Sequence, residues 1–177
     1  MGSWGKLAVG AFIAVAAGYF VANISLSKAV AAGSAESVGA VQVADMSLAE
    51  AITKRQELMK QMGGHMKAIK AFLDSNEGTA ADVTTHAQAI QTASGQIGEL
   101  FPAGTSLNDS VAKTAAKPEI WDKMDVFKTD ANALGELAGK LAEIAATGDA
   151  VAIGDQFGNL GKNGCGACHS EFRLKTE

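Results

Sequence analysis

The sequence predicts an all-α protein, and specifically an antiparallel four-helix bundle. Only two prolines occur in 177 residues, clusters of β-branched residues and Asn-Gly turn signals are scarce, and alanine and glycine are plentiful. Apolar residues recur at alternating steps of three and four along four long segments, which is the spacing of one face of an α-helix. Four such helices favour antiparallel neighbours around one core wherever the connection between them is short.

The first helix is expected over residues 47–74. Ser47 can cap it, and Glu50, three residues later, completes a capping box. Arg55 occupies a position where the apolar repeat calls for a hydrophobic residue. A buried guanidinium is costly unless it meets an anion, so Arg55 either binds one or snorkels from the edge of the seam to the surface. The apolar positions of this helix are Leu48, Ile52, Met59, Met62, Met66, Ile69 and Leu73.

The second and third helices are expected over residues 81–100 and 118–147. The segment Phe101-Pro102-Ala103-Gly104-Thr105 ends the second repeat and begins a long loop. Pro118 then stands in the first turn of the third helix, a position that proline favours. The seam of the second helix is Val83, Ala87, Ile90, Ser94, Ile97 and Phe101, and that of the third is Trp121, Met124, Lys128, Ala131, Leu134, Ala138, Leu141 and Ala145.

The fourth helix is expected over residues 150–174. Gly148 can end the third helix and Asp149 can cap the fourth. Small residues on the facing seams leave space inside the bundle. The fourth helix holds Ile153, Phe157, Leu160, Cys165, Cys168 and Phe172.

The first 46 residues are set apart from these helices. Residues 7–24 carry no charge, and at 1.5 Å per residue a helix of this length reaches about 27 Å, enough for a thin bilayer. Residues 1–31 are therefore a signal-anchor, which the length of the apolar run favours, or a signal peptide with Ala29-Val30-Ala31 as its cleavage site. Residues 32–46 are small and little charged and indicate a flexible linker. The bundle, residues 47–177, is then expected on the periplasmic side of a bacterial inner membrane.

Cys165-Gly166-Ala167-Cys168-His169 has the C-x-x-C-H spacing of a c-type haem attachment motif. Each thiol can add across a haem vinyl group, and the imidazole that follows can bind the iron. The alternative is a redox dithiol of thioredoxin type, but that motif normally lies near a βαβ pattern, which this sequence lacks. Both cysteines of the chain are in the motif, which predicts one haem c and no disulfide. The two propionates of this haem are suitable anionic partners for Arg55.

The chain resembles the class II c-type cytochromes, the cytochrome c prime family, over roughly residues 49–175. The resemblance implies that Cys165 and Cys168 hold the haem, that His169 is the proximal iron ligand and that Arg55 binds a propionate. It also implies that Met59 faces the distal side of the iron. The resemblance rests on Arg55-Gln56-x-x-Met59-Lys60, Phe101-Pro102-x-Gly104-Thr105, Lys117-Pro118-Glu119-Ile120-Trp121, Gly148-Asp149, and Gly161 ahead of Cys165-x-x-Cys168-His169 with Phe172-Arg173.

The side chain at position 59 relates to a difference between two branches of that family in the sixth ligand of the iron. Low-spin, six-coordinate members use a methionine thioether as sixth ligand and carry electrons, whereas high-spin, five-coordinate members bind nitric oxide or carbon monoxide. Met59 lies one helical turn from Arg55 on the same face, so its sulfur can reach the ring that Arg55 anchors. The run Glu57-Leu58-Met59-Lys60, followed by Gly63, resembles the low-spin branch. Alternatively, Met59 is a packing residue, as Met62 and Met66 on the same stripe indicate.

These residues predict a monohaem one-electron carrier, not an enzyme, with His169 and Met59 as metal ligands. The alternative is a five-coordinate protein that binds or scavenges nitric oxide. The expected partners are a redox donor and acceptor, the membrane through residues 7–24, and, since dimers occur in the family, a second copy of the chain. The net charge of −4 gives no support to nucleic-acid binding. His65 and His86 are alternative iron ligands in principle, but both are expected as solvated or rim residues.

Overall fold

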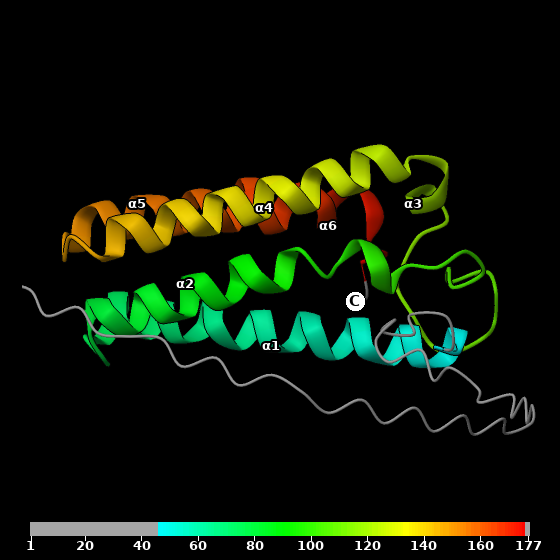
Figure 1. Ribbon diagram of the computed structural model, residues 1–177, viewed down its shortest axis with the longest axis horizontal. Helices are drawn as coiled ribbons and strands as arrows, with labels where there is room; N and C mark the ends of the chain where they lie inside the picture. The colour runs from blue at the N-terminus through cyan, green and yellow to red at the C-terminus, as the bar shows by residue number, and fades with distance from the viewer. Residues whose placement is uncertain (1–45, 176–177) are drawn as a thin grey trace, which may run out of the picture. The chain divides into compact units, whose positions relative to one another are not determined.

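The computed structural model describes residues 46–175, which form a four-helix bundle, as Figure 1 shows. Helices α1 (Leu48–Ser75) and α2 (Ala80–Ser94) make one antiparallel pair. Helix α4 (Met124–Ala145) pairs in the same way with a C-terminal helical run. The all-α prediction is confirmed for this part of the chain. The expected anchor at residues 7–24, and the linker at 32–46 except its last residue, lie outside the described residues.

No helix within residues 46–175 combines the length and the apolar character that crossing a membrane requires.

Both helices of the first pair begin with a capping box. At α1, Ser47 Oγ accepts from the Glu50 N–H at 3.2 Å, and the Glu50 carboxylate accepts from the Ser47 N–H at 2.9 Å. At α2, Thr79 Oγ1 accepts from the Asp82 N–H at 3.2 Å, and the Asp82 carboxylate accepts from the Thr79 N–H at 2.8 Å. These bonds satisfy N–H groups that a helix start leaves without partners, and they fix where α1 and α2 begin.

The second and third predicted helices are each interrupted. Helix α2 ends at Ser94, and only a short 3₁₀ turn (η2, Gly98–Leu100) continues the segment, because the glycines at 95 and 98 weaken the helix there. The connection to the next helix is a long loop over residues 101–118. The third helix breaks at Lys123 into a single turn, α3 (Glu119–Asp122), and α4. The Trp121 Nε1–H donates to the carbonyls of Phe101 and Pro102, both at 3.1 Å, which ties α3 to the loop.

The C-terminal run consists of α5 (Ala150–Asn159), a π-helical segment η3 (Leu160–Cys165) and α6 (Gly166–Phe172). Gly148 is left-handed, with φ 77°, and Asp149 caps α5 by accepting from the N–H groups of Val151 and Ala152 at 3.0 and 3.1 Å, as predicted. In η3 the Gly166 N–H donates to the Gly161 carbonyl, five residues back. Such π turns are often found at functional sites.

The end of α6 is fastened to the long loop. Arg173 pairs with Ala116 as an isolated antiparallel bridge. The Lys117 N–H donates to the Phe172 carbonyl at 3.0 Å, and the Leu174 N–H donates to the Ala115 carbonyl at 2.8 Å. The loop and α6 are therefore held together beside α1, so residues far apart in sequence meet at this end of the bundle.

Most of the predicted seam positions are buried or half-buried, with two exceptions, and one buried leucine was not predicted. All six predicted positions of the second helix are buried. Leu48 is instead 40% exposed and Lys128 is also exposed, whereas Leu58, which the repeat did not select, is buried at 8% exposure. Leu48 stands in the first turn of α1, where it lies beside Gly104 of the long loop. The fully buried large side chains are Phe127, Phe172, Ile52, Ile69, Ile90, Ile120, Leu141, Ile153, Leu160, Val83 and Thr105.

Candidate haem-binding site

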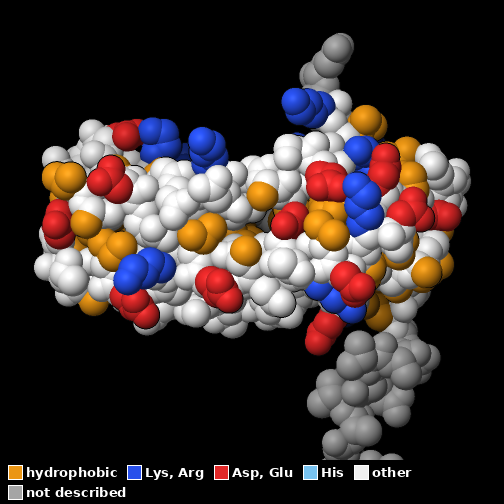
Figure 2. All heavy atoms as spheres, turned by 90° about the horizontal axis from the view of Figure 1, so that it is seen from above, with side chains coloured by type: hydrophobic (Ala, Val, Ile, Leu, Met, Phe, Trp, Pro, Cys, Tyr) orange, Lys and Arg blue, Asp and Glu red, His pale blue; other side chains and the backbone are white. Residues whose placement is uncertain are grey.

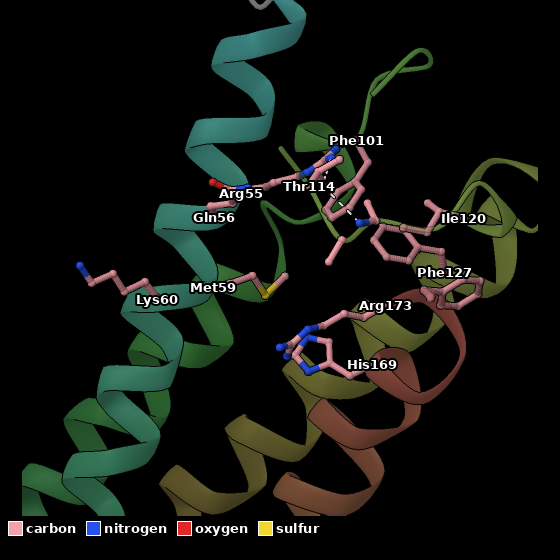
Figure 3. A pocket seen from close by; sticks show the side chains of 13 residues that line it. Arg55, Gln56, Met59, Lys60, Phe101, Thr114, Ile120, Phe127, His169 and Arg173 are labelled. Atoms are coloured by element: carbon pink, nitrogen blue, oxygen red, sulfur yellow. Dashed lines mark hydrogen bonds between the residues drawn. The ribbon is translucent and has the colours of Figure 1, made fainter. Parts of the chain in front are cut away.

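A cavity of about 360 Å³ lies between α1, the long loop, α4 and α6. Met59 enters it from α1 and His169 from α6, and the two side chains point toward one another (Figure 3). Arg55 lies one turn before Met59 on the same side. The fold therefore brings together three of the five predicted site residues, from elements more than a hundred residues apart in sequence. The rest of the lining is Gln56, Lys60, Phe101, Thr114, Ala115, Ala116, Ile120, Phe127, Phe172 and Arg173.

The other two predicted site residues, Cys165 and Cys168, precede His169 on the same helical run. Both are half-buried and pack against the core. Burial raises the pKa of the Cys165 thiol. Burial, with the carboxylates of Asp130 and Glu171 and the neighbouring Cys165, raises the pKa of the Cys168 thiol to about 12. A redox dithiol needs a lowered thiol pKa, so this environment argues against dithiol exchange.

His169 is half-buried at the mouth of the cavity. Burial lowers the pKa of its imidazole, and the nearby Arg173 guanidinium lowers it further. The ring is therefore neutral at physiological pH, which is the form that coordinates a metal. Its position is set by α6, whose end is bonded to the loop through residues 115–117.

Arg55 is buried at 3% exposure and does not snorkel to the surface. Its guanidinium donates to Thr105 Oγ1 at 2.8 Å, to the Thr105 carbonyl at 2.5 Å and to Thr114 Oγ1 at 2.8 Å. The guanidinium carbon also lies 4.5 Å from the centre of the Phe101 ring. All of these partners are neutral, and burial lowers the pKa of Arg55 to about 10.

The environment of Arg55 fits an anionic cofactor group. No ion pair within residues 46–175 involves its guanidinium, although it lines the cavity. A buried cation without an anion is unfavourable, so a carboxylate bound in the cavity would supply what the protein does not. The residues present therefore fit a haem c: two thiols for attachment, a neutral imidazole, a thioether and a buried cation beside one apolar cavity.

Sequence reasoning missed the loop residues that hold Arg55. Thr105 ends the segment that interrupts the second helical repeat, and it is fully buried. Thr114 lies 59 residues from Arg55, and nothing in the helical repeats marks it. Because both belong to an irregular loop, only the folded chain shows that they converge on the guanidinium.

His65 and His86 lie away from the cavity, as expected, but they are not simply solvated. Both are half-buried, and their Nδ1 atoms are 3.0 Å apart between α1 and α2. Burial lowers the pKa of His65, and the neighbouring His86 lowers it further.

Comparison with known proteins gives one family. The family model described as "Cytochrome C'" matches residues 50–173. A cytochrome c′ from Pararhodospirillum photometricum is 36% identical over 119 residues, which are 67% of this chain and 92% of the relative. A cytochrome c-556 from Agrobacterium tumefaciens (strain II Chrys) is 36% identical over 130 residues, 70% of this chain and 97% of the relative.

Solved structures give the same fold. A cytochrome c′ described as having an unusual ligand-controlled dimer dissociation superposes with a TM-score of 0.68 at 37% identity, over 75% of this chain and all of that one. A nitric oxide complex of a cytochrome c prime variant from Alcaligenes xylosoxidans gives a TM-score of 0.63 at 26% identity, over 73% of this chain and 98% of that one. Relatives named cytochrome c′ and cytochrome c-556 both occur, so similarity alone does not select a branch of the family.

Proposed function

We propose that this chain, which belongs to the cytochrome c′ family of generally non-enzymatic haem proteins, is a monohaem one-electron carrier in which His169 and Met59 would both bind the haem iron. The observation that carries this proposal is the placement of Met59 opposite His169 in one cavity (Figure 3). Histidine and methionine together raise the haem potential and suit reversible electron transfer.

Haem c, when bound, supplies an iron that changes between two oxidation states by one electron. The chain's own residues would hold and tune it: Cys165 and Cys168 through two thioethers, and His169 through its neutral imidazole. Arg55 would place a positive charge beside a propionate in a region that water does not reach. The rings of Phe101 and Phe127 pack edge to face with their centroids 4.7 Å apart, and they would form an apolar wall of the cavity that excludes water.

The surroundings of Met59 distinguish it from the other methionines of α1. Met62 is buried at 6% exposure in the core cluster, as a packing residue is expected to be. Met59 is half-buried and lines the cavity, with its sulfur on the side that faces His169 (Figure 3). Because a thioether is a weak ligand that must be held in place, the position of Met59 on a long, capped helix supports the proposal.

The second candidate is a five-coordinate protein that binds nitric oxide, with Met59 as a packing residue. The similarity to the nitric oxide complex from Alcaligenes xylosoxidans favours this candidate. The two candidates differ in whether the distal position is open to a diatomic gas.

Carbon monoxide binding to the reduced holoprotein separates the candidates. The proposal predicts an absorption spectrum of low-spin type that carbon monoxide does not change. Met59→Leu removes the thioether with little change in volume and should make the spectrum sensitive to carbon monoxide. Met66→Leu, the same substitution two turns along α1, is the matched control and should behave like the unchanged protein. If the unchanged protein binds carbon monoxide, or if Met59→Leu has no effect on the spectrum, Met59 is not a ligand of the iron.

We also propose that the carrier works on the periplasmic side of the membrane with an acidic redox partner. Lys60, Arg173 and Lys175 line the cavity mouth or the hollow beside His169, which gives the exposed edge of the site positive charge. At one end of the face seen in Figure 2, in contrast, acidic and basic side chains are intermingled. We propose in addition that residues 7–24 anchor the protein in the membrane and that the protein forms a dimer. The intact mass of the purified protein shows whether the N-terminal segment is retained, and sedimentation measures the oligomeric state.

A further inference from the structure

The contact between His65 and His86 is a second cluster of metal-binding groups, separate from the cavity. His65 lies on α1 and His86 on α2, with their Nδ1 atoms 3.0 Å apart. The ring centroids are 5.2 Å apart and the rings are tilted by 45°. The chain has three histidines, and the third, His169, lies in the cavity. Neither His65 nor His86 has a role in the proposed function.

From this geometry we propose that His65 and His86 form a two-imidazole site for a divalent transition-metal ion, with water in the remaining coordination positions. Imidazole nitrogens bind zinc at about 2.0–2.1 Å. Two nitrogens 3.0 Å apart, each about 2.1 Å from a shared ion, subtend an angle of about 90° at that ion. Opening the pair by about 0.4 Å gives the tetrahedral angle that zinc favours, so a small rotation of the two side chains is sufficient.

The two helices hold the imidazoles in place before any ion binds. One turn after His65, Ile69 is fully buried, and Ala87, directly after His86, is also fully buried. The side chains therefore project from two helices whose neighbouring positions are locked in the core. Ligands presented by rigid helices lose little freedom on binding, which favours coordination. Both rings are half-buried, so the pair is open to solvent on one side.

Protonation competes weakly with metal binding at His65. Burial and the neighbouring His86 hold the pKa of His65 below its ordinary value, so its ring is neutral at pH 7 and above. For both Nδ1 atoms to bind one ion, each ring must carry its proton on Nε2. Without an ion, one Nδ1–H donates to the other Nδ1, and that hydrogen bond is the competing explanation of the 3.0 Å distance.

The ligand set limits both the affinity and the kind of ion. Asp82 lies one turn before His86, but its Oδ2 already accepts from the Thr79 N–H and Oγ1–H, each at 2.8 Å. Within the described residues no group of three or more metal-ligating side chains occurs. Two imidazoles select zinc, copper or nickel over magnesium or calcium, which prefer oxygen ligands.

Titration calorimetry of the full-length holoprotein with Zn²⁺ alone at pH 7.5 tests the site. We expect one Zn²⁺ per chain, tighter binding of Cu²⁺ and no binding of Mg²⁺. Removing a residue that only supports a metal ligand weakens binding about 10–100-fold, so removing a ligand itself, in His65→Ala or His86→Ala, should cost about 100-fold or more. Gln61→Ala, one turn before His65 on the same face of α1, keeps both imidazoles and is the matched control.

Nuclear magnetic resonance of the unchanged protein gives an independent readout that does not depend on the variants' folding. Zn²⁺ should shift the ring signals of His65 and His86 and leave the haem absorption unchanged. The proposal is wrong if the unchanged protein takes up no Zn²⁺, or if the ring signals of the two histidines do not move. It is also wrong if either folded alanine variant binds Zn²⁺ as the unchanged protein does. In each case the pair is an interhelical hydrogen bond only. None of these results bears on the role of Met59.

Discussion

Replacing Arg55 by methionine tests whether the buried guanidinium meets an anion in the holoprotein. The substitution keeps most of the apolar volume and removes the charge. Its cost depends on what the guanidinium binds, so the free energy of unfolding distinguishes a cation with an anionic partner from one held only by the loop.

The contacts of Arg55 set the expected magnitude. Without the guanidinium, Thr105 Oγ1 still donates to the Pro102 carbonyl at 2.8 Å, and Thr114 Oγ1 still accepts from the Ala116 N–H at 3.2 Å. All three hydrogen bonds from the guanidinium are lost, but only the Thr105 carbonyl is then left without a partner, which costs about 1–3 kcal/mol. Removing a buried charge returns several kcal/mol of desolvation free energy, so without an anion the two effects nearly cancel. With a bound propionate the anion would be left unpaired, and the loss becomes about 3–5 kcal/mol.

Equilibrium unfolding of the holoprotein in guanidinium chloride, followed by far-ultraviolet circular dichroism, measures this loss. Lys54→Met removes a positive charge from the adjacent, exposed position of α1 and should change the free energy of unfolding by no more than about 0.5 kcal/mol. A change below about 1 kcal/mol for Arg55→Met would refute the propionate assignment.

Three further predictions concern packing, pH and charge. In thermal unfolding, Gly164→Ala should destabilise by about 1–3 kcal/mol, because its Cβ would lie 2.9 Å from Leu134 Cδ1, whereas Gly158→Ala, with nothing within 4 Å, should stabilise by about 0.5–1 kcal/mol. Because the pKa of His65 is lowered on folding, the unfolded chain binds more protons just below pH 6.5, so stability should fall as the pH drops from 7.5 to 5. His65→Gln should make the stability depend less steeply on pH, and an unchanged pH dependence would show that His65 is not its source. The rate of electron transfer to an acidic partner should fall as ionic strength rises, and equal rates at low and high salt would exclude electrostatic steering.

Much of the fold could be predicted because the helices obey local rules. The capping box at Ser47, the cap at Asp149 and the buried stripe of α2 each follow from a few neighbouring residues. The breaks could not be placed in this way. The interruption at Lys123 accompanies a hydrogen bond from Trp121 to a loop twenty residues away, and the π turn before Cys165 lies tightly against Leu134. Both depend on tertiary contacts, which a helical repeat does not contain.

The site residues likewise fall into two groups: those that a sequence pattern marks and those that only the folded chain brings together. Cys165, Cys168 and His169 are recognisable because their chemistry fixes their spacing, and Arg55 because a charge stands in an apolar repeat. The threonines that bind Arg55 lie in an irregular loop without such a pattern. The pairing of His65 with His86 depends on the register of two helices, which spacing within either helix does not determine.

The central claim is that one haem is covalently bound through the C-terminal motif. Mass spectrometry of the acid-denatured protein, after digestion, measures it directly on the peptide that contains Cys165 and Cys168. We predict that this peptide carries the mass of one haem and keeps its visible absorption after denaturation. A peptide with two free thiols or a disulfide, and no bound porphyrin, would contradict the account.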